Sequence, residues 1–171
     1  MTVVLLEGPD GGGKTTLASH PWLGAFERRH FGLLDDPLRE YRAFASMAAA
    51  SPRGLFVIER MHPSERIYGE VARGASRISP EQALDLERIL ERAGCVAVLC
   101  LPTFSACWTA WVGRGAAEYL KDEKSLRAVW RLYRKWPSET SLPVIVHDRT
   151  RMTPEKTLLR VRSILNGAGP P

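Results

Sequence analysis

Short apolar runs alternate along the chain with segments of helical periodicity, and each run ends in polar or turn residues. Alternation of this kind is typical of an α/β fold with a parallel sheet. No internal repeat, low-complexity tract or linker interrupts it. The pattern predicts roughly five strands, with helices on both faces of the sheet. The strand candidates are Val3 to Leu6, a weaker run near His30 to Leu33, Leu55 to Ile58, Val96 to Leu101, and Val144 to His147.

Three helix starts are readable from local signals. The letters SPEQ from Ser79 form a capping box with proline at the first helical position, and Gly94 marks the end of that helix. Thr153, followed by a proline, opens the last helix, and Thr103 caps another. A helix beginning near Lys14 should be short, because the His-Pro pair at 20–21 stops it.

The segment from Gly8 to Thr15, GPDGGGKT, follows the first apolar run directly and fits the pattern G-x-x-x-x-G-K-[ST]. Glycines allow such a loop to point its backbone N–H groups at phosphate oxygens. Lys14 adds a positive charge, and the hydroxyl of Thr15 is a ligand for Mg²⁺. The sequence therefore predicts a nucleotide-binding protein with the three-layer fold of P-loop NTPases.

The composition predicts one domain that spans residues 1–171, since 44% of the residues are hydrophobic. No apolar run approaches the ~20 residues of a membrane span, and the first residues lack a basic signal-peptide region. We expect a soluble, cytoplasmic protein, in the host cytoplasm if it comes from a phage. The three cysteines lack zinc-site spacing and are expected to be buried, reduced thiols.

The net charge of +5 and the pI of about 9.4 have two explanations. Arginine supplies most of the positive residues, and its planar fork suits phosphate or nucleic-acid contacts. Biased residue usage in an Arg-, Ala- and Gly-rich genome would give the same balance. Charge alone therefore names no partner.

Ligands of open parallel sheets bind beyond the carboxyl ends of the strands. The polar segments that follow the predicted strands are therefore the candidate site. These segments are Gly8 to Thr15, His30 to Asp36, Glu59 to Arg66, Pro102 to Phe104, and Asp148 to Thr150.

A second motif, ERMHPSERIYG from Glu59, follows the third predicted strand. Together with the phosphate loop and its preceding Glu7, it resembles the thymidylate kinase family of nucleoside monophosphate kinases. The pairing of SERIYG with the later CLP and W-x-x-R-x-x-x-E-Y-L is similar to compact deoxynucleoside monophosphate kinases of bacteriophages. The chain departs from the family where HFGLLDD from His30 replaces Arg-Glu-Pro-Gly, and where Gly69 replaces a glutamine.

The resemblance implies a role for each matching residue. Asp10 faces the sugar of the acceptor nucleotide, Arg60 binds its phosphate and Arg73 lies beside its base. Glu59 holds Mg²⁺ through water, together with Thr15, and Lys14 and Asp10 take part in catalysis. The residues implied for the ATP phosphates are Gly8, Gly11, Gly12, Gly13, Lys14, Thr15 and Thr16.

Several of these residues also have a structural interpretation. Tyr68, at helical spacing from Ser64, is either a base contact or the edge of the core. Arg60 could be a surface arginine, and Arg66 and Arg77 could be solvated charges. The tryptophans at 108, 111, 130 and 136 are expected to serve packing.

Phosphoryl transfer needs positive charge on the transferring group, and the phosphate loop contains no arginine. If the resemblance holds, this charge comes from a short lid, approximately residues 113–122. Arg114, beside the glycines of that segment, is the first choice, and Arg131 on the following helix is the second. The alternative is an ordinary loop before a solvated helix face.

The function best supported is Mg-ATP-dependent phosphoryl transfer to a (deoxy)nucleoside monophosphate, which gives the diphosphate. The second hypothesis is a kinase that acts within DNA, for example on the hydroxymethyl group of a modified pyrimidine, with a backbone groove formed by Arg28, Arg29, Arg66 or Arg77. A third is a switch that only binds or hydrolyses NTP. The third is disfavoured, because no N-K-x-D motif occurs and no predicted strand ends in Asp-Glu.

Overall fold

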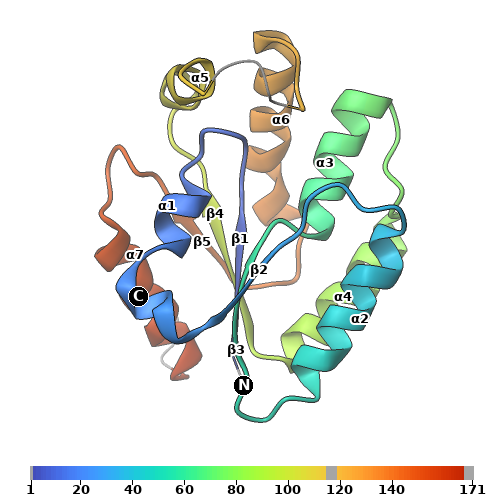
Figure 1. Ribbon diagram of the computed structural model, residues 1–171, viewed down its shortest axis with the longest axis vertical. Helices are drawn as coiled ribbons and strands as arrows, with labels where there is room; N and C mark the ends of the chain where they lie inside the picture. Colours follow the sequence, from blue (N-terminus) through green and yellow to red (C-terminus); the bar gives the residue numbers. More distant parts are fainter. Residues whose placement is uncertain (1, 115–118, 168–171) are drawn as a thin grey trace.

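Five parallel strands form a single sheet at the centre of the computed structural model, which describes residues 2–114 and 119–167 (Figure 1). The strands lie in the order β2-β3-β1-β4-β5, so that β1 is central. Four of the five predicted strands are found within a residue or two of their expected bounds. The strands are β1 (Thr2–Glu7), β2 (Glu27–His30), β3 (Leu55–Glu59), β4 (Cys95–Cys100) and β5 (Val144–His147).

Helices cover both faces of the sheet, as predicted. In Figure 1 the helices α2, α3, α4 and α6 lie on one side of the strands and α1 and α7 on the other, while α5 lies beyond their carboxyl ends. The helices are α1 (Lys14–Ala18), α2 (Pro37–Ala49), α3 (His62–Arg73), α4 (Pro80–Arg92), α5 (Phe104–Val112), α6 (Glu123–Lys135) and α7 (Pro154–Leu165), with 3₁₀ turns at Pro21–Ala25 and Trp136–Ser138.

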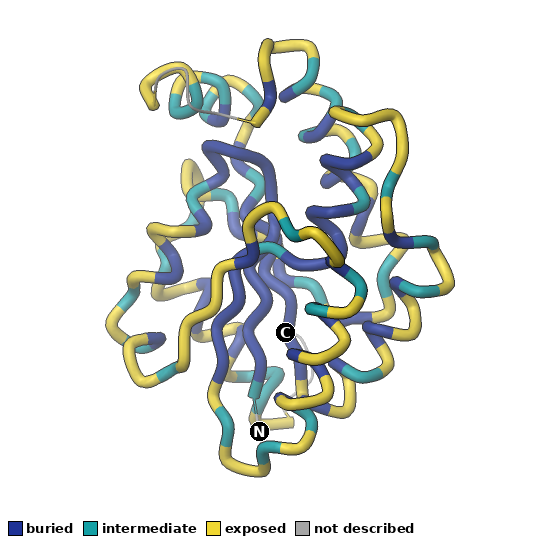
Figure 2. The backbone as a smooth tube through the Cα atoms, turned by 45° about the vertical axis from the view of Figure 1, so that its right-hand side comes forward, coloured by how far each residue is buried: buried dark blue, intermediate teal, exposed yellow. Residues whose placement is uncertain are grey.

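Alternate side chains of the central strand β1 pack into two separate hydrophobic cores, one on each face of the sheet. Val3 and Leu5 pack with the larger helical layer, while Val4 and Leu6 pack with α1 and α7. Every residue of β4 is buried, as expected for a strand covered on both faces. Figure 2 shows this burial along the strands, with exposed segments at the loops and outer helix turns.

The predicted position of the second strand was wrong by about three residues. It covers Glu27–His30 rather than His30 to Leu33, and all four of its residues are exposed at the edge of the sheet. A charged edge strand has no apolar alternation, because it has little to bury. Three residues of the predicted run, Phe31 to Leu33, lie just after the strand, and Phe31 is buried among the rings of Tyr41 and Phe44.

Helix α2 was not predicted, although its signals are present. The side chain of Asp36 accepts a hydrogen bond from the N–H of Arg39, and Pro37 occupies the first helical position. Tyr41 and Phe44 of this helix are buried against the sheet. The predicted caps are confirmed at Ser79, which forms both bonds of a capping box, at Thr103 and at Thr153. No described helix is long and apolar enough to cross a membrane.

Candidate active site

The phosphate loop lies at the carboxyl end of β1 and is packed against the backbone of neighbouring elements. Gly8, Gly11 and Gly13 have φ angles of 140°, 76° and 98°, a region that favours glycine. A Cβ at Gly8 would lie 2.3 Å from the carbonyl oxygen of Cys100, and one at Gly11 would lie 2.4 Å from that of Cys107. The glycines therefore let the loop sit directly on the end of β4 and on α5.

The ammonium group of Lys14 lies inside this loop. Its Nζ donates to the carbonyl oxygens of Gly8 at 2.6 Å and Pro9 at 2.9 Å. Burial, with the nearby charge of Arg60, lowers the pKa of Lys14 to about 8. Lys14 thus remains mainly protonated at neutral pH, and a phosphate has to compete with two carbonyl groups for its hydrogen bonds.

Thr15 and Glu59 meet beside the loop. The hydroxyl of Thr15 donates to Oε2 of Glu59 at 2.8 Å, and Arg28 binds Oε1 of the same carboxylate through Nε, also at 2.8 Å, and through Nη2. A hydroxyl and a carboxylate placed together at a phosphate loop fit Mg²⁺, which prefers oxygen ligands and shares them with phosphate and water. Any cation that binds Oε1 of Glu59 has to displace the guanidinium of Arg28.

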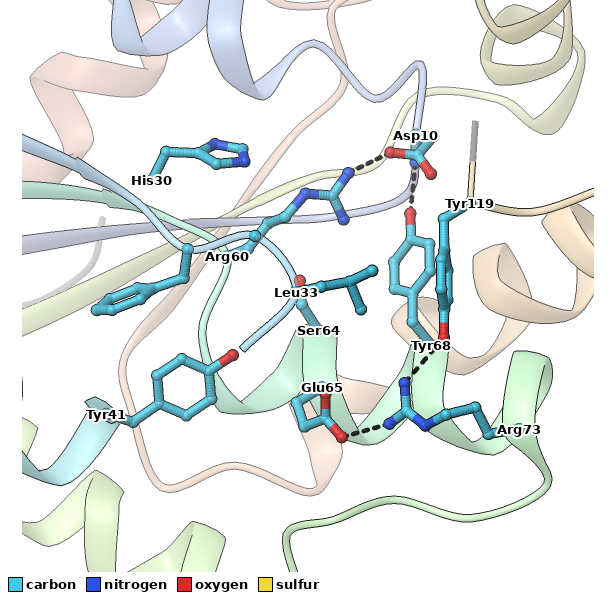
Figure 3. A pocket seen from close by; sticks show the side chains of 12 residues that line it. Asp10, His30, Leu33, Tyr41, Arg60, Ser64, Glu65, Tyr68, Arg73 and Tyr119 are labelled. Carbon is cyan, nitrogen blue, oxygen red and sulfur yellow. Dashed lines mark hydrogen bonds and ion pairs between the residues drawn. The ribbon is translucent and has the colours of Figure 1, made fainter. Parts of the chain in front are cut away.

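Arg60 and Asp10 form an ion pair that joins the end of β3 to the loop (Figure 3). Arg60 adopts a φ of 66°, the left-handed region that non-glycine residues rarely enter, and its N–H donates to Leu6. Burial alone would raise the pKa of Asp10, but Arg60 and Lys14 hold it below its ordinary value. Arg60 is therefore a half-buried residue paired with Asp10 and not a free surface arginine.

Tyr68 lies at the edge of the core and also borders a cavity. Its side chain is buried, its hydroxyl accepts a hydrogen bond from the N–H of Asp10 at 2.8 Å, and its ring faces the guanidinium of Arg60 at 5.0 Å. The same ring lines a cavity and lies 6.3 Å from the ring of Tyr119. It thus belongs both to the core edge and to the wall of a candidate acceptor pocket.

This cavity of about 210 Å³, which we call the acceptor pocket after the role that the sequence predicts for it, lies between the loop, α3 and the segment after β2 (Figure 3). Aromatic and charged side chains share its wall. The lining residues are Asp10, His30, Phe31, Gly32, Leu33, Tyr41, Arg60, Ser64, Glu65, Tyr68, Arg73 and Tyr119.

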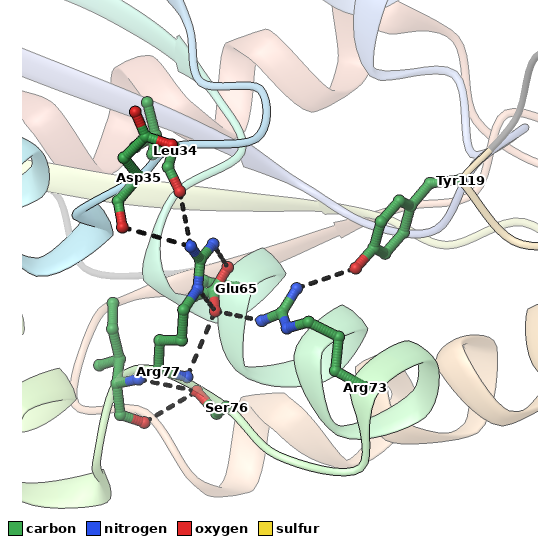
Figure 4. A network of polar contacts seen from close by, with 8 residues as sticks. Leu34, Asp35, Glu65, Arg73, Ser76, Arg77 and Tyr119 are labelled. Carbon is green, nitrogen blue, oxygen red and sulfur yellow. Dashed lines mark hydrogen bonds and ion pairs between the residues drawn. The ribbon is translucent and has the colours of Figure 1, made fainter.

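A buried carboxylate, Glu65, organises the polar end of the acceptor pocket (Figure 4). It binds Arg73 and Arg77, and the guanidinium of Arg77 also donates to the carbonyl oxygens of Leu34 and Asp35. Burial would raise the pKa of Glu65, but hydrogen bonds from Arg77 and the charge of Arg73 lower it. Arg77 is thus exposed but not only a solvated charge, because its contacts tie the segment after β2 to α3.

Gly69, which replaces the glutamine of the resembling family, lies beside this cluster. A Cβ at Gly69 would lie 2.5 Å from Nη2 of Arg73. The missing side chain leaves room for the guanidinium of Arg73, which reaches Glu65 and the hydroxyl of Tyr119.

A second pocket, the phosphate pocket, surrounds the glycine-rich loop and adjoins the first. It is lined by the loop, by Glu59 and by the arginines at 60, 114 and 149. Three residues, Asp10, His30 and Arg60, line both pockets. The two cavities therefore meet at one wall, where groups bound in each would face one another.

A further buried carboxylate, Glu7, fixes the start of α3 relative to β1. It accepts hydrogen bonds from the N–H of Met61 at 2.6 Å, the hydroxyl of Ser64 at 2.7 Å and the hydroxyl of Tyr133 at 2.8 Å. Three elements converge on this carboxylate, and the segment that carries Arg60 is held with them.

The predicted lid is only partly described, since residues 115–118 lie outside the described residues. Arg114 lines the phosphate pocket, and its Nε donates to Ala110 at 3.4 Å. Arg131 instead lines a separate groove between α3 and α6, together with Glu70 and Arg134. The structure thus brings Arg114, but not Arg131, to the phosphate loop. Trp108 and Trp111 of α5 stack on each other, and Trp136, which follows α6, is buried.

One arginine of the phosphate pocket was not singled out from the sequence. Arg149 follows β5 within the candidate segment Asp148 to Thr150, but nothing in the sequence distinguished it from other exposed arginines. Only the strand order, which places β5 beside β4, brings it to the loop.

No family model and no curated protein matches the chain. Among solved structures, it is similar to the YorR protein from Bacillus subtilis in complex with phosphorylated GDP, with 17% identity and a TM-score of 0.77 over 96% of this chain and 95% of that chain. It is also similar to deoxyadenosine kinase from M. mycoides with bound dATP, with 13% identity and a TM-score of 0.62 over 97% of this chain and 100% of that chain. What is shared at these identities is the fold. The predicted three-layer α/β architecture is thereby confirmed.

Proposed function

We propose that the protein is a phosphotransferase that moves the terminal phosphoryl group of ATP to a (deoxy)nucleoside monophosphate and gives the diphosphate. The observation that carries this proposal is the shared wall of Asp10, His30 and Arg60 between the phosphate pocket and the acceptor pocket. A donor phosphate on the loop and an acceptor phosphate at Arg60 would then face one another, as transfer requires.

The residues of the phosphate pocket suit the donor. Lys14 and the loop amides would bind the triphosphate, and Thr15 with Glu59 would hold Mg²⁺, whose charge screens the phosphates during transfer. Arg114 would add positive charge to the transferring group. The deoxyadenosine kinase of similar fold was solved with bound dATP and with bound dCTP, which supports a nucleotide as the kind of ligand.

The residues of the acceptor pocket suit a nucleotide monophosphate. Arg60 presents a guanidinium for the phosphate, Asp10 would face the sugar, and Tyr68 offers a ring to the base. The ionised Glu65 and its partner Arg73 supply polar partners at the far end. We propose the thymidylate kinase-like class for the enzyme on these residues and leave the acceptor base open.

The alternative that the acceptor lies within DNA loses part of its support. Of the four arginines expected to follow a DNA backbone, Arg28 is bound to Glu59 and Arg77 to Glu65 and two carbonyl groups. These guanidinium groups hold the protein together at the site. A free nucleotide is therefore the favoured acceptor.

The decisive experiment is a transfer assay with γ-labelled ATP and Mg²⁺. Parallel reactions receive each deoxynucleoside monophosphate, unmodified DNA, or DNA that contains hydroxymethylated pyrimidines. We expect label in at least one free monophosphate, insensitive to added DNA. Label only in DNA would overturn the proposal in favour of the DNA kinase, and label only in inorganic phosphate would indicate a hydrolase or switch.

A matched pair of variants tests the site in the same assay. Arg60→Gln removes the acceptor-side guanidinium and should raise the acceptor KM by about tenfold or more, while MgATP binding changes little. Arg88→Gln removes an exposed arginine paired with the exposed Asp85 and should leave both constants unchanged. Equal effects of the two variants would contradict the role given to Arg60.

A further inference from the structure

Arg149 is an exposed arginine at the phosphate pocket to which the proposed reaction assigns no role. It lies in the turn between β5 and α7, and it lines the phosphate pocket but is not among the residues that line the acceptor pocket. Its place beside the loop depends on two packing contacts.

The aliphatic stem of Arg149 packs on Gly13. A Cβ at Gly13 would lie 3.0 Å from Cδ of Arg149, so the glycine leaves the room that the stem occupies. The guanidinium is then held by two carbonyl groups, because its Nη2 donates to Ala106 at 2.8 Å and to Gly11 at 3.4 Å. The head of Arg149 is thus fixed between the phosphate loop and α5.

Both of these bonds use Nη2. Within residues 2–114 and 119–167, no acceptor is recorded for Nε or Nη1 of Arg149, so these N–H groups remain available to a ligand. An arginine whose position is fixed before a ligand arrives loses little conformational entropy on binding.

The position of Arg149 relative to the loop indicates which part of a nucleotide it meets. It lines the phosphate pocket with Lys14 and also a neighbouring cavity with Gly13, Thr16 and Thr150. Arg149 therefore lies where the two cavities adjoin, at the Gly13 to Thr16 end of the loop, whose backbone cradles the α- and β-phosphates in loops of this kind.

We infer that Arg149 is a binding residue for the α- and β-phosphates of the donor nucleotide. Its planar guanidinium would add charge-assisted hydrogen bonds to those of the loop amides. Arg60 serves the acceptor and Arg114 the transferring group, so each arginine meets a different part of the reaction. The inference rests on the proposed function only in taking a nucleoside triphosphate as the donor.

Calorimetric titration of the full chain tests this assignment without any transfer step. Arg149→Gln should weaken the binding of MgATP and of MgADP by the same factor, about tenfold or more, and leave acceptor affinity unchanged. The control Arg160→Gln removes the same charge from an exposed position on α7 and should bind both nucleotides as the wild type does.

Each outcome of the titration decides the assignment. Unchanged binding by R149Q, an equal loss in R160Q, or a loss confined to MgATP would overturn it, since a γ-phosphate contact spares MgADP. If R149Q melts at a lower temperature than the wild type without ligand, R149K replaces it, because lysine keeps the stem and charge but not the fork. A loss of about threefold or more in R149K then supports the contact, and unchanged affinity overturns it. These affinities stay informative if no acceptor is ever phosphorylated.

Discussion

At the scale of single residues, the site is built from arginines that each have a fixed partner. Arg60 binds Asp10, Arg28 binds Glu59, and Arg77 binds Glu65. The sequence identified Arg60 through its position in a motif. It could not show that the other two are engaged, because an ion pair between distant positions leaves no local pattern.

Comparing the turnover of two variants distinguishes Arg114 from Arg131 as the source of the catalytic positive charge. Arg114→Ala should lower turnover by about 10² or more, with a smaller loss of ATP binding, because Arg114 lines the phosphate pocket. Arg131→Ala should change turnover by less than about twofold, because Arg131 lies in the groove between α3 and α6. Steady-state turnover and equilibrium nucleotide binding, measured for both variants, give the answer.

The reverse order, with turnover lost in R131A and kept in R114A, would show that α6 supplies the charge. Arg127, Arg131 and Arg134 follow one another at spacings of four and three residues, which places them on one helix face, but this spacing does not predict which part of the protein that face meets. In the structure Arg127 lies 3.8 Å from the ring centre of Phe104, and Arg134 faces the ring of Trp130 at 5.8 Å. That direction depends on tertiary packing, which the spacing of charges cannot show.

At the scale of elements, a buried carboxylate joins three segments of the larger helical layer. Glu87 of α4 accepts hydrogen bonds from the hydroxyl of Thr140 at 2.7 Å and from the N–H and hydroxyl of Ser141 at 2.9 and 3.0 Å, and it lies 3.2 Å from Nε2 of His62. It thereby ties α4 to the start of α3 and to the segment before β5.

This cluster predicts an acid-dependent part of the stability. Burial would raise the pKa of Glu87, but hydrogen bonds from His62, Ser141 and Thr140 lower it to about 2. A carboxylate with a lowered folded pKa stabilises the protein above its unfolded pKa, and this contribution fades as pH falls toward the folded value. Glu87→Gln should therefore reduce the free energy of unfolding by about 2 kcal/mol at neutral pH. This difference in unfolding free energy between the wild type and the variant should become smaller below about pH 5.

Urea denaturation of wild type and E87Q at a series of pH values measures this difference. Glu91→Gln, at an exposed position of the same helix, is the control and should differ little from wild type at any pH. A gap between wild type and E87Q that stays constant from neutral to acidic pH would mean that the contribution comes from packing and not from the carboxylate charge.

The elements themselves were predictable to different degrees, for physical reasons. Buried strands such as β4 leave continuous apolar runs, and a capping box such as that at Ser79 is a local hydrogen-bond pattern. The edge strand Glu27–His30 buries nothing and leaves no such run. Helix α2 has an Asp-Pro start at Asp36 and a stripe of residues from Tyr41 to Ala48 that the structure buries, so this helix was predictable from local signals.

At the scale of the whole molecule, the strand order assembles the site. Because β3 and β4 flank β1, the residues that follow all three strands meet at the phosphate loop. The alternation of strands and helices predicted the parallel sheet, and the resemblance implied which residues gather at the loop. The order of the strands was not predicted. The contact between Arg149 and Gly13 could not be predicted either, because it depends on that order.

The positive charge of the molecule leads to a prediction about salt. The net charge of +5 could reflect a nucleic-acid surface, but Arg28 and Arg77 are committed to internal contacts. Transfer to a free monophosphate should change only a few-fold between about 50 and 200 mM salt, whereas a DNA-bound substrate that involves six or more phosphate contacts would lose about 10³ in affinity. Initial rates at subsaturating acceptor over this range distinguish the two. A steep decline with salt would favour DNA as the acceptor.

Two buried cysteines beneath the phosphate loop can report how often this part of the structure opens. The loop rests on the carbonyl groups of Cys100 and Cys107, whose side chains are themselves buried. Burial raises the pKa of Cys100 to about 12 and that of Cys107 to about 11, so neither thiol reacts readily while it stays buried beneath the loop. The rate at which these two thiols are alkylated therefore measures how often the structure beneath the loop opens. A nucleotide that binds the closed loop should lower this rate.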